Sequence, residues 1–240
     1  MKELKRAHFR FFVSPENIAG DVFVCRERAL VNQVKNVFRL KAGDAIEILD
    51  DSGLEYLVKI RELGIKEIKG EILGKRLAKN ESAVKIHLYC SPIKVGNFEM
   101  VLEKGTELGV FAFHPIICQN PIVKISDIKV RWERIIKEAS EQSKRGVIPK
   151  IYQPQKVEDA VKAIRGGLSL VADEKAVHKL LKIAEGAKEI NLFVGPEGGF
   201  SEQERDLFGK TGFEFISLSK TILRSETATI IGLGLIGNLL

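Results

Sequence analysis

Little in this 240-residue sequence suggests a fold held together by cysteines, built on a metal or spanning a membrane. The three cysteines, Cys25, Cys90 and Cys118, lie far apart without a CxxC pair, so neither a disulfide framework nor a zinc site is indicated. The four histidines have no ligand-like spacing. The longest apolar run, residues 228–240, is shorter than the ~20 residues that span a bilayer. We therefore expect a metal-free globular protein with reduced thiols.

The N-terminus is charged from its second residue and has no apolar segment of signal-peptide type, which predicts a cytoplasmic protein. Apolar residues make up 45% and charged residues 29% of the chain, the balance of an ordinary globular protein. The formal net charge is +6. Residues 1–80 carry 16 Lys and Arg against 12 Asp and Glu. This basic excess suits a partner rich in phosphate, although proteins without a nucleic-acid role often share it.

Short apolar stretches separated by turns characterise residues 1–73. The alternation in 45–49 and 56–60, on either side of Asp51-Ser52-Gly53, has the period of two that a β-hairpin requires. Residues 26–38 show helical spacing instead, which predicts one short helix packed on a small β-barrel. The polar stretch 74–82 lacks periodicity and is interpreted as a linker.

From residue 83 onward, apolar runs of strand length alternate with amphipathic segments of helix length. Strands are predicted at 84–90, 110–118, 168–173, 190–195 and 213–218, and helices at about 98–108, 128–142, 157–164, 176–184, from 202 and from 225. Such alternation is typical of a largely parallel sheet covered by helices on both faces. The fold class expected for the chain is thus α/β, with a small β-rich domain in front.

The most informative segment is Val194-Gly-Pro-Glu-Gly-Gly-Phe-Ser-Glu-Gln-Glu204. A strand ends, three glycines follow, and Ser201 with Glu204 forms the capping box that begins a helix. Glycines at the carboxyl end of a parallel strand let the backbone approach a ligand. A tight turn without a ligand is the alternative, and usually needs fewer glycines.

A second loop between a strand and a helix, residues 218–228, brings Lys220 and Arg224 to the same edge of the sheet. The two loops should converge on one pocket. Arg224 could equally be a surface arginine offsetting Glu226. The string Gly232-Leu-Gly-Leu-Ile-Gly237 matches a dinucleotide-binding fingerprint, but it lies outside a strand-turn-helix context and the acidic partner is missing. We interpret its glycines as sites where a buried helix packs closely.

Gly195-Pro-Glu-Gly-Gly199 together with the pattern LxxxILRSETA at 218–228 resembles the bacterial 16S rRNA uridine N3-methyltransferases, the ribosomal small subunit methyltransferase E family of the SPOUT superfamily. Further matching blocks are FRFFV at 9–13, VFRLKAGD at 37–44, LEKGTELGV at 102–110 and RWERIIKEASEQSKR at 131–145. The resemblance covers essentially the whole chain.

The resemblance implies a PUA-like β-barrel over 1–73 that binds RNA, and a SPOUT methyltransferase domain over 83–240 tied in a trefoil knot. It also implies a homodimer, S-adenosylmethionine as cofactor, no metal, and methylation of uridine N3 in 16S rRNA of the small ribosomal subunit, at the decoding-centre uridine 1498. Arg224 becomes the candidate catalytic residue, with Glu197 and Glu226 as orienting groups. The cofactor would be held by Val194, Gly195, Pro196, Glu197, Gly198, Gly199, Leu218, Ile222, Leu223, Thr227 and Ala228. The RNA would be held by Arg6, Arg10, Arg39, Lys41 and Arg145.

Two alternatives remain open at this stage. One is a methyltransferase of the same superfamily that acts on tRNA or 23S rRNA, for instance on a ribose hydroxyl. The other is a non-catalytic RNA-binding module, which would have no use for the glycine loop beside Arg224.

Overall fold

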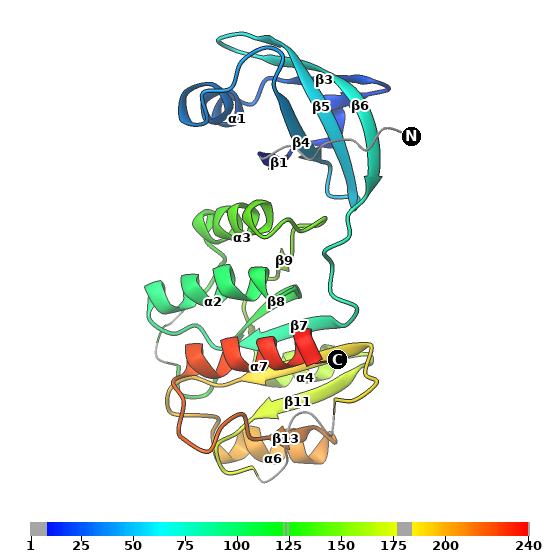
Figure 1. The fold of residues 1–240 in the computed structure, drawn as a ribbon. Coiled ribbons are helices and arrows are strands. Elements are labelled where there is room, and N and C mark those ends of the chain that lie inside the picture. Colours follow the sequence, from blue (N-terminus) through cyan, green and yellow to red (C-terminus); the bar gives the residue numbers. More distant parts are fainter. Residues whose placement is uncertain (1–8, 122, 124, 177–183, 240) are drawn as a thin grey trace. The chain divides into compact units, whose positions relative to one another are not determined.

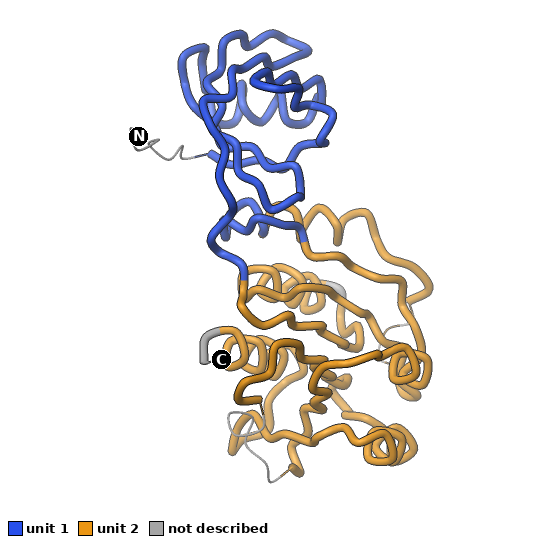
Figure 2. The backbone as a smooth tube through the Cα atoms, turned by 90° about the vertical axis from the view of Figure 1, so that its right-hand side faces the viewer, with its two compact units in different colours: residues 1–81, 140–148 blue, residues 82–139, 149–240 orange. Residues whose placement is uncertain are grey.

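The computed structural model describes residues 9–121, 123, 125–176 and 184–239. They form two compact units (Figure 2). Unit 1 comprises the chain up to Glu81 together with Ser140–Ile148, and unit 2 comprises Ser82–Ala139 and Pro149–Leu240. Residues 140–148, from the second half of the chain, therefore belong to the N-terminal unit. The domain bounds predicted from the sequence place them in the second domain, because each domain was assumed to be continuous in the chain.

Unit 1 is built on a six-stranded sheet with the order β1-β4-β5-β6-β3-β2. Its strands are β1 (Arg10–Phe12), β2 (Ile18–Ala19), β3 (Val22–Cys25), β4 (Ala45–Leu49), β5 (Leu54–Leu63) and β6 (Ile68–Leu77). All neighbours are antiparallel except β1 and β4. The predicted hairpin is β4–β5, and both Asp51 and Gly53 in its turn have positive φ. The described pairings run from β1 to β2 without closing, so the closed barrel stays a prediction.

One short helical segment packs on this sheet, as the spacing of residues 26–38 predicts. It begins as α1 (Arg28–Asn32) and continues as a π-helical turn, η2 (Gln33–Val37). Leu30, Val31 and Val34 are buried in the core of the unit. A short 3-10 helix, η1 (Pro15–Asn17), precedes β2.

The linker expected at 74–82 is wrong in its first four residues, because β6 continues to Leu77. The sequence there is polar, but Arg76 pairs across the sheet with Glu55. Its guanidinium lies 2.7 Å from Glu55 and 2.8 Å from Glu47. Cross-strand ion pairs of this kind hold a strand that has no apolar alternation.

Unit 2 contains a seven-stranded sheet in which every pairing is parallel. The order is β10-β8-β7-β12-β11-β13, and β9 also pairs with β8. The strands are β7 (Lys85–Cys90), β8 (Val110–Ile117), β9 (Lys150–Ile151), β10 (Gln155–Lys156), β11 (Leu168–Ala172), β12 (Glu189–Val194) and β13 (Glu214–Ile216). The α/β fold with a parallel sheet is confirmed.

Helices cover both faces of this sheet (Figure 1). They are α2 (Val95–Glu107), α3 (Val130–Gln142), α4 (Val157–Ala163), α6 (Glu202–Lys210) and α7 (Ser225–Leu239). Alternate residues of β12 face opposite sides. Phe193 packs in a cluster with residues of α4 and α6, whereas the Leu192 side chain meets α7 at Gly232. The helix predicted at 176–184 falls almost entirely outside the described residues.

The glycines of 232–237 lie inside α7 rather than in a strand-to-helix turn, so the rejection of a dinucleotide fingerprint is confirmed. A Cβ on Gly232 would lie 3.2 Å from the Leu192 side chain, and one on Gly237 would lie 3.0 Å from the Leu108 carbonyl oxygen. Both glycines therefore allow the helix to pack closely on its neighbours, as their spacing indicated.

Candidate active site

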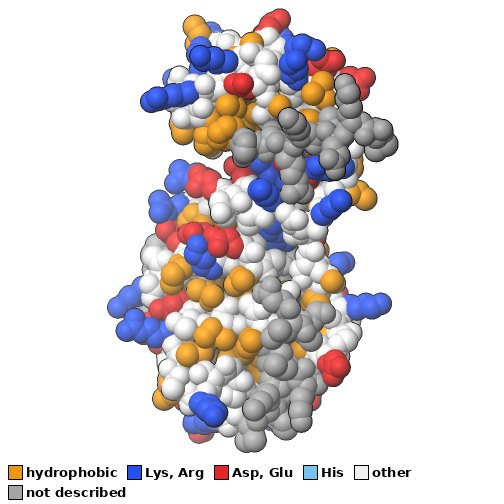
Figure 3. Space-filling view, viewed as in Figure 1, with side chains coloured by type: hydrophobic (Ala, Val, Ile, Leu, Met, Phe, Trp, Pro, Cys, Tyr) orange, Lys and Arg blue, Asp and Glu red, His pale blue; other side chains and the backbone are white. Residues whose placement is uncertain are grey.

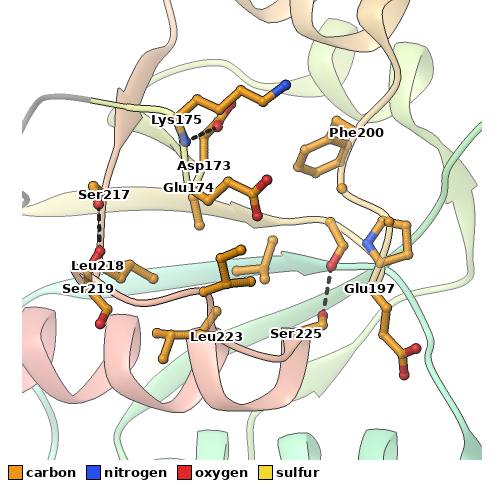
Figure 4. Close-up of a pocket in the computed structure, with 18 of the residues that line it drawn as sticks. Asp173, Glu174, Lys175, Glu197, Phe200, Ser217, Leu218, Ser219, Leu223 and Ser225 are labelled. Carbon is orange, nitrogen blue, oxygen red and sulfur yellow. Dashed lines mark hydrogen bonds between the residues drawn. The ribbon is translucent and has the colours of Figure 1, made fainter.

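A pocket of about 240 Å³ lies at the carboxyl ends of β11, β12 and β13. Parallel strands bind ligands at this edge because the loops that leave neighbouring strands converge there. Three loops line the pocket: residues 172–175 after β11, 194–200 after β12 and 217–223 after β13. Ser225 and Ala228 of α7, with Glu202 and Arg205 of α6, complete it. Figure 4 shows these loops around the opening.

The glycine loop is held in a defined shape by its own backbone and by α7. Gly199 donates its N–H to the Pro196 carbonyl at 2.8 Å and has a φ of 72°, a conformation that favours glycine. The Ser225 hydroxyl donates to the Gly195 carbonyl at 2.7 Å. Because Ser225 is buried, this bond fixes the start of α7 against the loop.

The capping box predicted at Ser201 and Glu204 is confirmed. The Ser201 hydroxyl accepts from the Glu204 N–H, and a Glu204 carboxylate oxygen accepts from the Ser201 N–H. The second carboxylate oxygen accepts from the Gln119 N–H at 2.8 Å, which joins the end of β8 to the start of α6. Helix α6 thus begins at a fixed place directly after the glycine loop.

Ten of the eleven residues predicted to hold the cofactor line this pocket: Val194, Gly195, Pro196, Glu197, Gly198, Gly199, Leu218, Ile222, Leu223 and Ala228. Thr227 is not among the lining residues. It lies in the first turn of α7, between Ser225 and Ala228. The two loops therefore converge as their positions in the sequence predict.

Sequence reasoning missed the third loop, where Asp173, Glu174 and Lys175 line the pocket. The strand before this loop was predicted, but the sequence does not show that it lies between β12 and β13. Asp173 accepts the Lys175 N–H at 2.8 Å and forms an ion pair with Arg205. Only knowledge of the strand order could place these residues beside the glycine loop.

Arg224 lies between the lining residues Leu223 and Ser225, and its side chain is exposed. Its carbonyl accepts the N–H of Ala228 at 2.8 Å at the start of α7. Of the two predicted orienting groups, Glu197 is exposed and its carboxylate points away from the pocket (Figure 4). Glu226 is buried, and it accepts a hydrogen bond from the Asn97 side chain of α2 at 3.1 Å.

Two of the predicted RNA contacts are corrected by the structure. Arg10 is buried, and its guanidinium lies 2.7 Å from Glu55 and 3.6 Å from Glu47. Arg145 is also buried and lies 2.7 Å from Glu81. Arg10 donates to the Arg145 carbonyl at 2.7 Å. Side chains alternate along β1, so Arg10 lies on the face opposite to the core residue Phe11, where Glu47, Glu55 and the Arg145 carbonyl surround it.

These arginines serve the structure of unit 1, where they attach residues 140–148 to the sheet. Further bonds in the same attachment run from Phe12 N–H to the Glu141 carboxylate, and from Gly146 N–H to the Glu81 carboxylate. By contrast, Arg39 and Lys41 are exposed. Arg39 adopts a φ of 54°, uncommon for a residue with a side chain. Arg6 lies outside the described residues.

Among the described residues there is no cluster of His, Cys, Asp and Glu that could hold a metal ion. Over the same residues, no helix has the length and apolarity needed to cross a membrane. The three cysteines are buried, as expected of core thiols.

Comparison with known proteins agrees with the resemblance seen in the sequence. Residues 80–237 match the RNA methyltransferase domain family, and residues 34–73 match the RNA methyltransferase PUA domain family. Ribosomal RNA small subunit methyltransferase E of Mesomycoplasma hyopneumoniae is 32% identical over 92% of this chain and 96% of its own length. The Synechocystis protein of the same name is 30% identical over 97% and 78%.

Solved structures show the same relationship. Ribosomal RNA small subunit methyltransferase E of Neisseria gonorrhoeae, bound to S-adenosyl methionine, superposes with a TM-score of 0.89 at 29% identity, covering 96% of this chain and 97% of that one. A Legionella pneumophila methyltransferase in complex with the same cofactor gives 0.86 at 28% identity, with the same shares covered. With an RNA methyltransferase domain over most of its length and a PUA domain in front, this chain belongs to the ribosomal RNA small subunit methyltransferase E family.

Proposed function

We propose that this protein transfers the methyl group of S-adenosylmethionine to N3 of a uridine in 16S rRNA of the small ribosomal subunit, at the decoding-centre uridine 1498. The observation that carries the proposal is the pocket at the edge of the parallel sheet, lined by ten of the residues that the family pattern assigns to the cofactor. Relatives of the same fold bind S-adenosylmethionine. The lining residues offer backbone N–H and carbonyl groups from the glycine loop and apolar surface from Leu218, Ile222 and Leu223.

The reaction requires loss of the imide proton from N3 and in-line attack of that nitrogen on the methyl carbon. Negative charge then spreads to the two carbonyl oxygens beside N3. A cation held next to them lowers the barrier because it interacts more strongly with the transition state than with neutral uracil. Arg224 fits this role, since its side chain is exposed and its two neighbours in the chain, Leu223 and Ser225, line the pocket.

RNA binding would use exposed cations. Figure 3 shows Lys and Arg side chains interspersed with Asp and Glu on the visible face of each unit, rather than gathered in one patch. Within unit 1, the exposed residues Arg39 and Lys41 lie two positions apart in the loop after η2 and can contact phosphates. Arg6 stays a predicted contact. We further propose a homodimer that forms through α7 and acts in the cytoplasm, and a knotted path of the chain through the glycine loop.

The test is methyl transfer to small ribosomal subunits purified from cells that lack this activity, with labelled S-adenosylmethionine and mass mapping of the product. A methyl group at uracil N3 in 16S rRNA supports the proposal. A methylated ribose hydroxyl, or methylation of tRNA or 23S rRNA only, contradicts it in favour of another activity. A protein that binds RNA without binding the cofactor would be a non-catalytic module.

In the same assay we expect Arg224→Ala to bind S-adenosylmethionine nearly as the unmodified protein does, but to lose turnover by about 100-fold or more, the range seen when a transition-state donor is removed. Lys220→Ala is the matched control, because Lys220 is also an exposed cation between two lining residues of the same loop, Ser219 and Thr221. An equal loss in both variants would contradict a specific role of Arg224. An effect of Arg224→Ala on the KM for RNA alone would place Arg224 among the docking residues.

A further inference from the structure

The side chains that line the pocket carry more negative than positive charge, although adenosine itself is uncharged. Its lining includes four carboxylates, Asp173, Glu174, Glu197 and Glu202, and two cations, Lys175 and Arg205. The formal charge of the lining is therefore −2. These groups come from the loops after β11 and β12 and from α6, so the excess is not a feature of one segment.

The cations are not placed to neutralise Glu174. Arg205 is engaged with Asp173, whose side chain is only 5% exposed, and it also stacks over the Phe215 ring at 5.3 Å. In Figure 4 the ammonium of Lys175 lies near the top of the view, apart from the Glu174 carboxylate. In the part of the chain that the structure describes, Glu174 has no ion pair.

The carboxylates differ in direction. In Figure 4 the Glu174 carboxylate points into the pocket, between Asp173 and Leu223, whereas the Glu197 carboxylate points away from it. Glu174 follows directly on Asp173, whose backbone N–H is bonded to the Ile216 carbonyl at 2.9 Å. This bond and the bond from Lys175 N–H to Asp173 fix the loop from which Glu174 extends.

We infer that Glu174 is a specificity residue that distinguishes the sulfonium cofactor from its thioether product by charge. The inference rests on the proposed function. S-adenosylmethionine carries a positive sulfonium, a positive ammonium and a negative carboxylate, hence a net charge of +1. S-adenosylhomocysteine lacks the sulfonium charge and is neutral overall. Shape, ribose and adenine are shared, so charge at sulfur is the main property by which a pocket can prefer one to the other.

A carboxylate directed at the pocket attracts the sulfonium and loses that attraction when the methyl group leaves. Glu174 is exposed, so water screens this interaction, and we expect it to be worth roughly tenfold in affinity rather than the larger factor of a fully enclosed pair. The consequence is faster exchange of product for fresh cofactor. The cofactor pocket would thus favour turnover as well as binding.

The experiment compares dissociation constants by calorimetry for S-adenosylmethionine and S-adenosylhomocysteine. We expect Glu174→Gln to weaken binding of the first roughly tenfold and of the second by less than twofold. Sinefungin, which carries an ammonium in place of the methylated sulfur, should follow S-adenosylmethionine. Glu214→Gln removes the same charge from an exposed side chain of β13 that does not line the pocket and serves as the matched control, with both constants expected to stay within twofold. Unchanged thermal unfolding of each variant shows that the fold is intact.

Equal losses for both compounds would overturn the inference, because Glu174 would then bind a part that they share, such as the ribose hydroxyls. Unchanged affinities would overturn it as well. In both cases the unmodified protein still binds its cofactor, and the proposed function stands. Failure of the unmodified protein to bind either compound would instead overturn the proposed function itself.

Discussion

Two adjacent glycines of the cofactor loop have different conformational requirements. Gly199 has a φ of 72°, whereas Gly198 lies outside the left-handed region, and a Cβ on either would meet no atom within 4 Å. A side chain at Gly199 therefore costs backbone energy, on the order of 1 kcal/mol for alanine and more for a β-branched residue. At Gly198 the only cost would come from a ligand that occupies the space.

We therefore expect Gly199→Val to abolish S-adenosylmethionine binding while the protein stays folded, and Gly199→Ala to weaken it roughly tenfold, the equivalent of about 1 kcal/mol or slightly more. Gly199→Asn, which tolerates positive φ, should recover part of the loss. Calorimetry measures the affinity and circular dichroism the fold. Gly198→Ala controls for size without strain. If Gly199→Val binds the cofactor normally, this loop is not part of the site.

The arginines show how far residue roles can be predicted from sequence. Arg10 and Arg39 both lie in basic, aromatic surroundings, and a sequence without structure assigns both to phosphate. The structure distinguishes them by burial. Arg10 is buried against carboxylates of β4 and β5, whereas Arg39 is exposed in a loop. Neither Glu47 nor Glu55 is near Arg10 in sequence, and β1 pairs with β4 only in the folded sheet.

The two arginines should respond to mutation in different ways. Arg10→Met leaves two buried carboxylates with Arg76 alone, and we expect it to destabilise unit 1 by about 3 kcal/mol. Arg39→Ala should leave stability unchanged and weaken RNA binding, with a shallower dependence of affinity on salt. Chemical denaturation and RNA titrations at several salt concentrations measure the two effects. A stable Arg10→Met variant with impaired RNA binding would restore the phosphate role that the structure removes.

Among the elements, the strands of unit 2 carry an aromatic stack across the sheet. Phe193 of β12 stacks on Tyr89 of β7, Tyr89 on His114 of β8, and His114 on Tyr152, with ring centroids 4.3 to 4.6 Å apart. His114 also lies 3.1 Å from His87 between ring nitrogens. Burial, and secondarily the nearby His87, lowers the pKa of His114 to about 4.

This shift makes the stability of unit 2 dependent on pH. The unfolded chain takes up the proton near pH 6.5 and the folded chain only near pH 4, so protonation favours unfolding between these values. Stability should fall as the pH falls from about 6.5 to 4, by on the order of 3 kcal/mol in total. Urea unfolding between pH 5 and 7 tests this above the range in which carboxylates titrate.

His114→Phe is the informative variant, because it keeps the stacked ring and cannot take up a proton. We expect its stability to depend less on pH over the same interval, with a remainder from His87, whose pKa burial also lowers. An identical slope in the variant would show that His114 is not the titrating group.

The strands and helices of unit 2 were predicted more accurately than the end of β6 and the turn after α1 in unit 1. The strands and helices of unit 2 can be predicted from the spacing of apolar residues. A buried parallel strand is a continuous apolar run, and an amphipathic helix has apolar residues three or four positions apart, which form a stripe along one face. The last residues of β6 could not be predicted in this way, because ion pairs rather than apolar alternation hold Arg76 in the sheet. The π-helical turn after α1 likewise has no sequence signal that we recognise.

At the scale of the whole molecule, the order of segments in the sequence does not give the composition of the units. Residues 140–148 complete unit 1, although they lie between elements of unit 2. The block RWERIIKEASEQSKR, residues 131–145, overlaps this segment, and the domain bounds implied by the resemblance place both in the methyltransferase domain. The bonds that attach residues 140–148 to the rest of unit 1 involve Phe12, Glu81 and Asp51, and their partners are at least 65 residues apart in the chain. Pairing over such separations is visible only in the fold.

The helix α7 has more apolar surface than unit 2 covers. It packs closely on the sheet at Gly232, and Leu233 and Ile236 are buried, but Ile230, Ile231 and Leu235 are only partly buried. A helix that is hydrophobic on every side needs a second surface to cover it. A second copy of the chain is the simplest partner, because a two-fold axis brings the same apolar face of each copy together.

We therefore expect sedimentation to give a particle of twice the 26.8 kDa chain mass at micromolar concentration. Ile231→Arg and Leu235→Arg should each shift it toward the monomer, since a charge buried in an apolar interface is costly unless it is paired. Val130→Arg, on an α3 side chain that is 82% exposed, introduces the same charge outside the proposed interface and should leave the dimer intact. Because α7 also supplies Ser225 and Ala228 to the pocket, the monomeric variants should bind S-adenosylmethionine less tightly than the control does. A monomeric unmodified protein would refute the interface, whereas monomeric variants with full cofactor affinity would show that dimerisation and cofactor binding are independent.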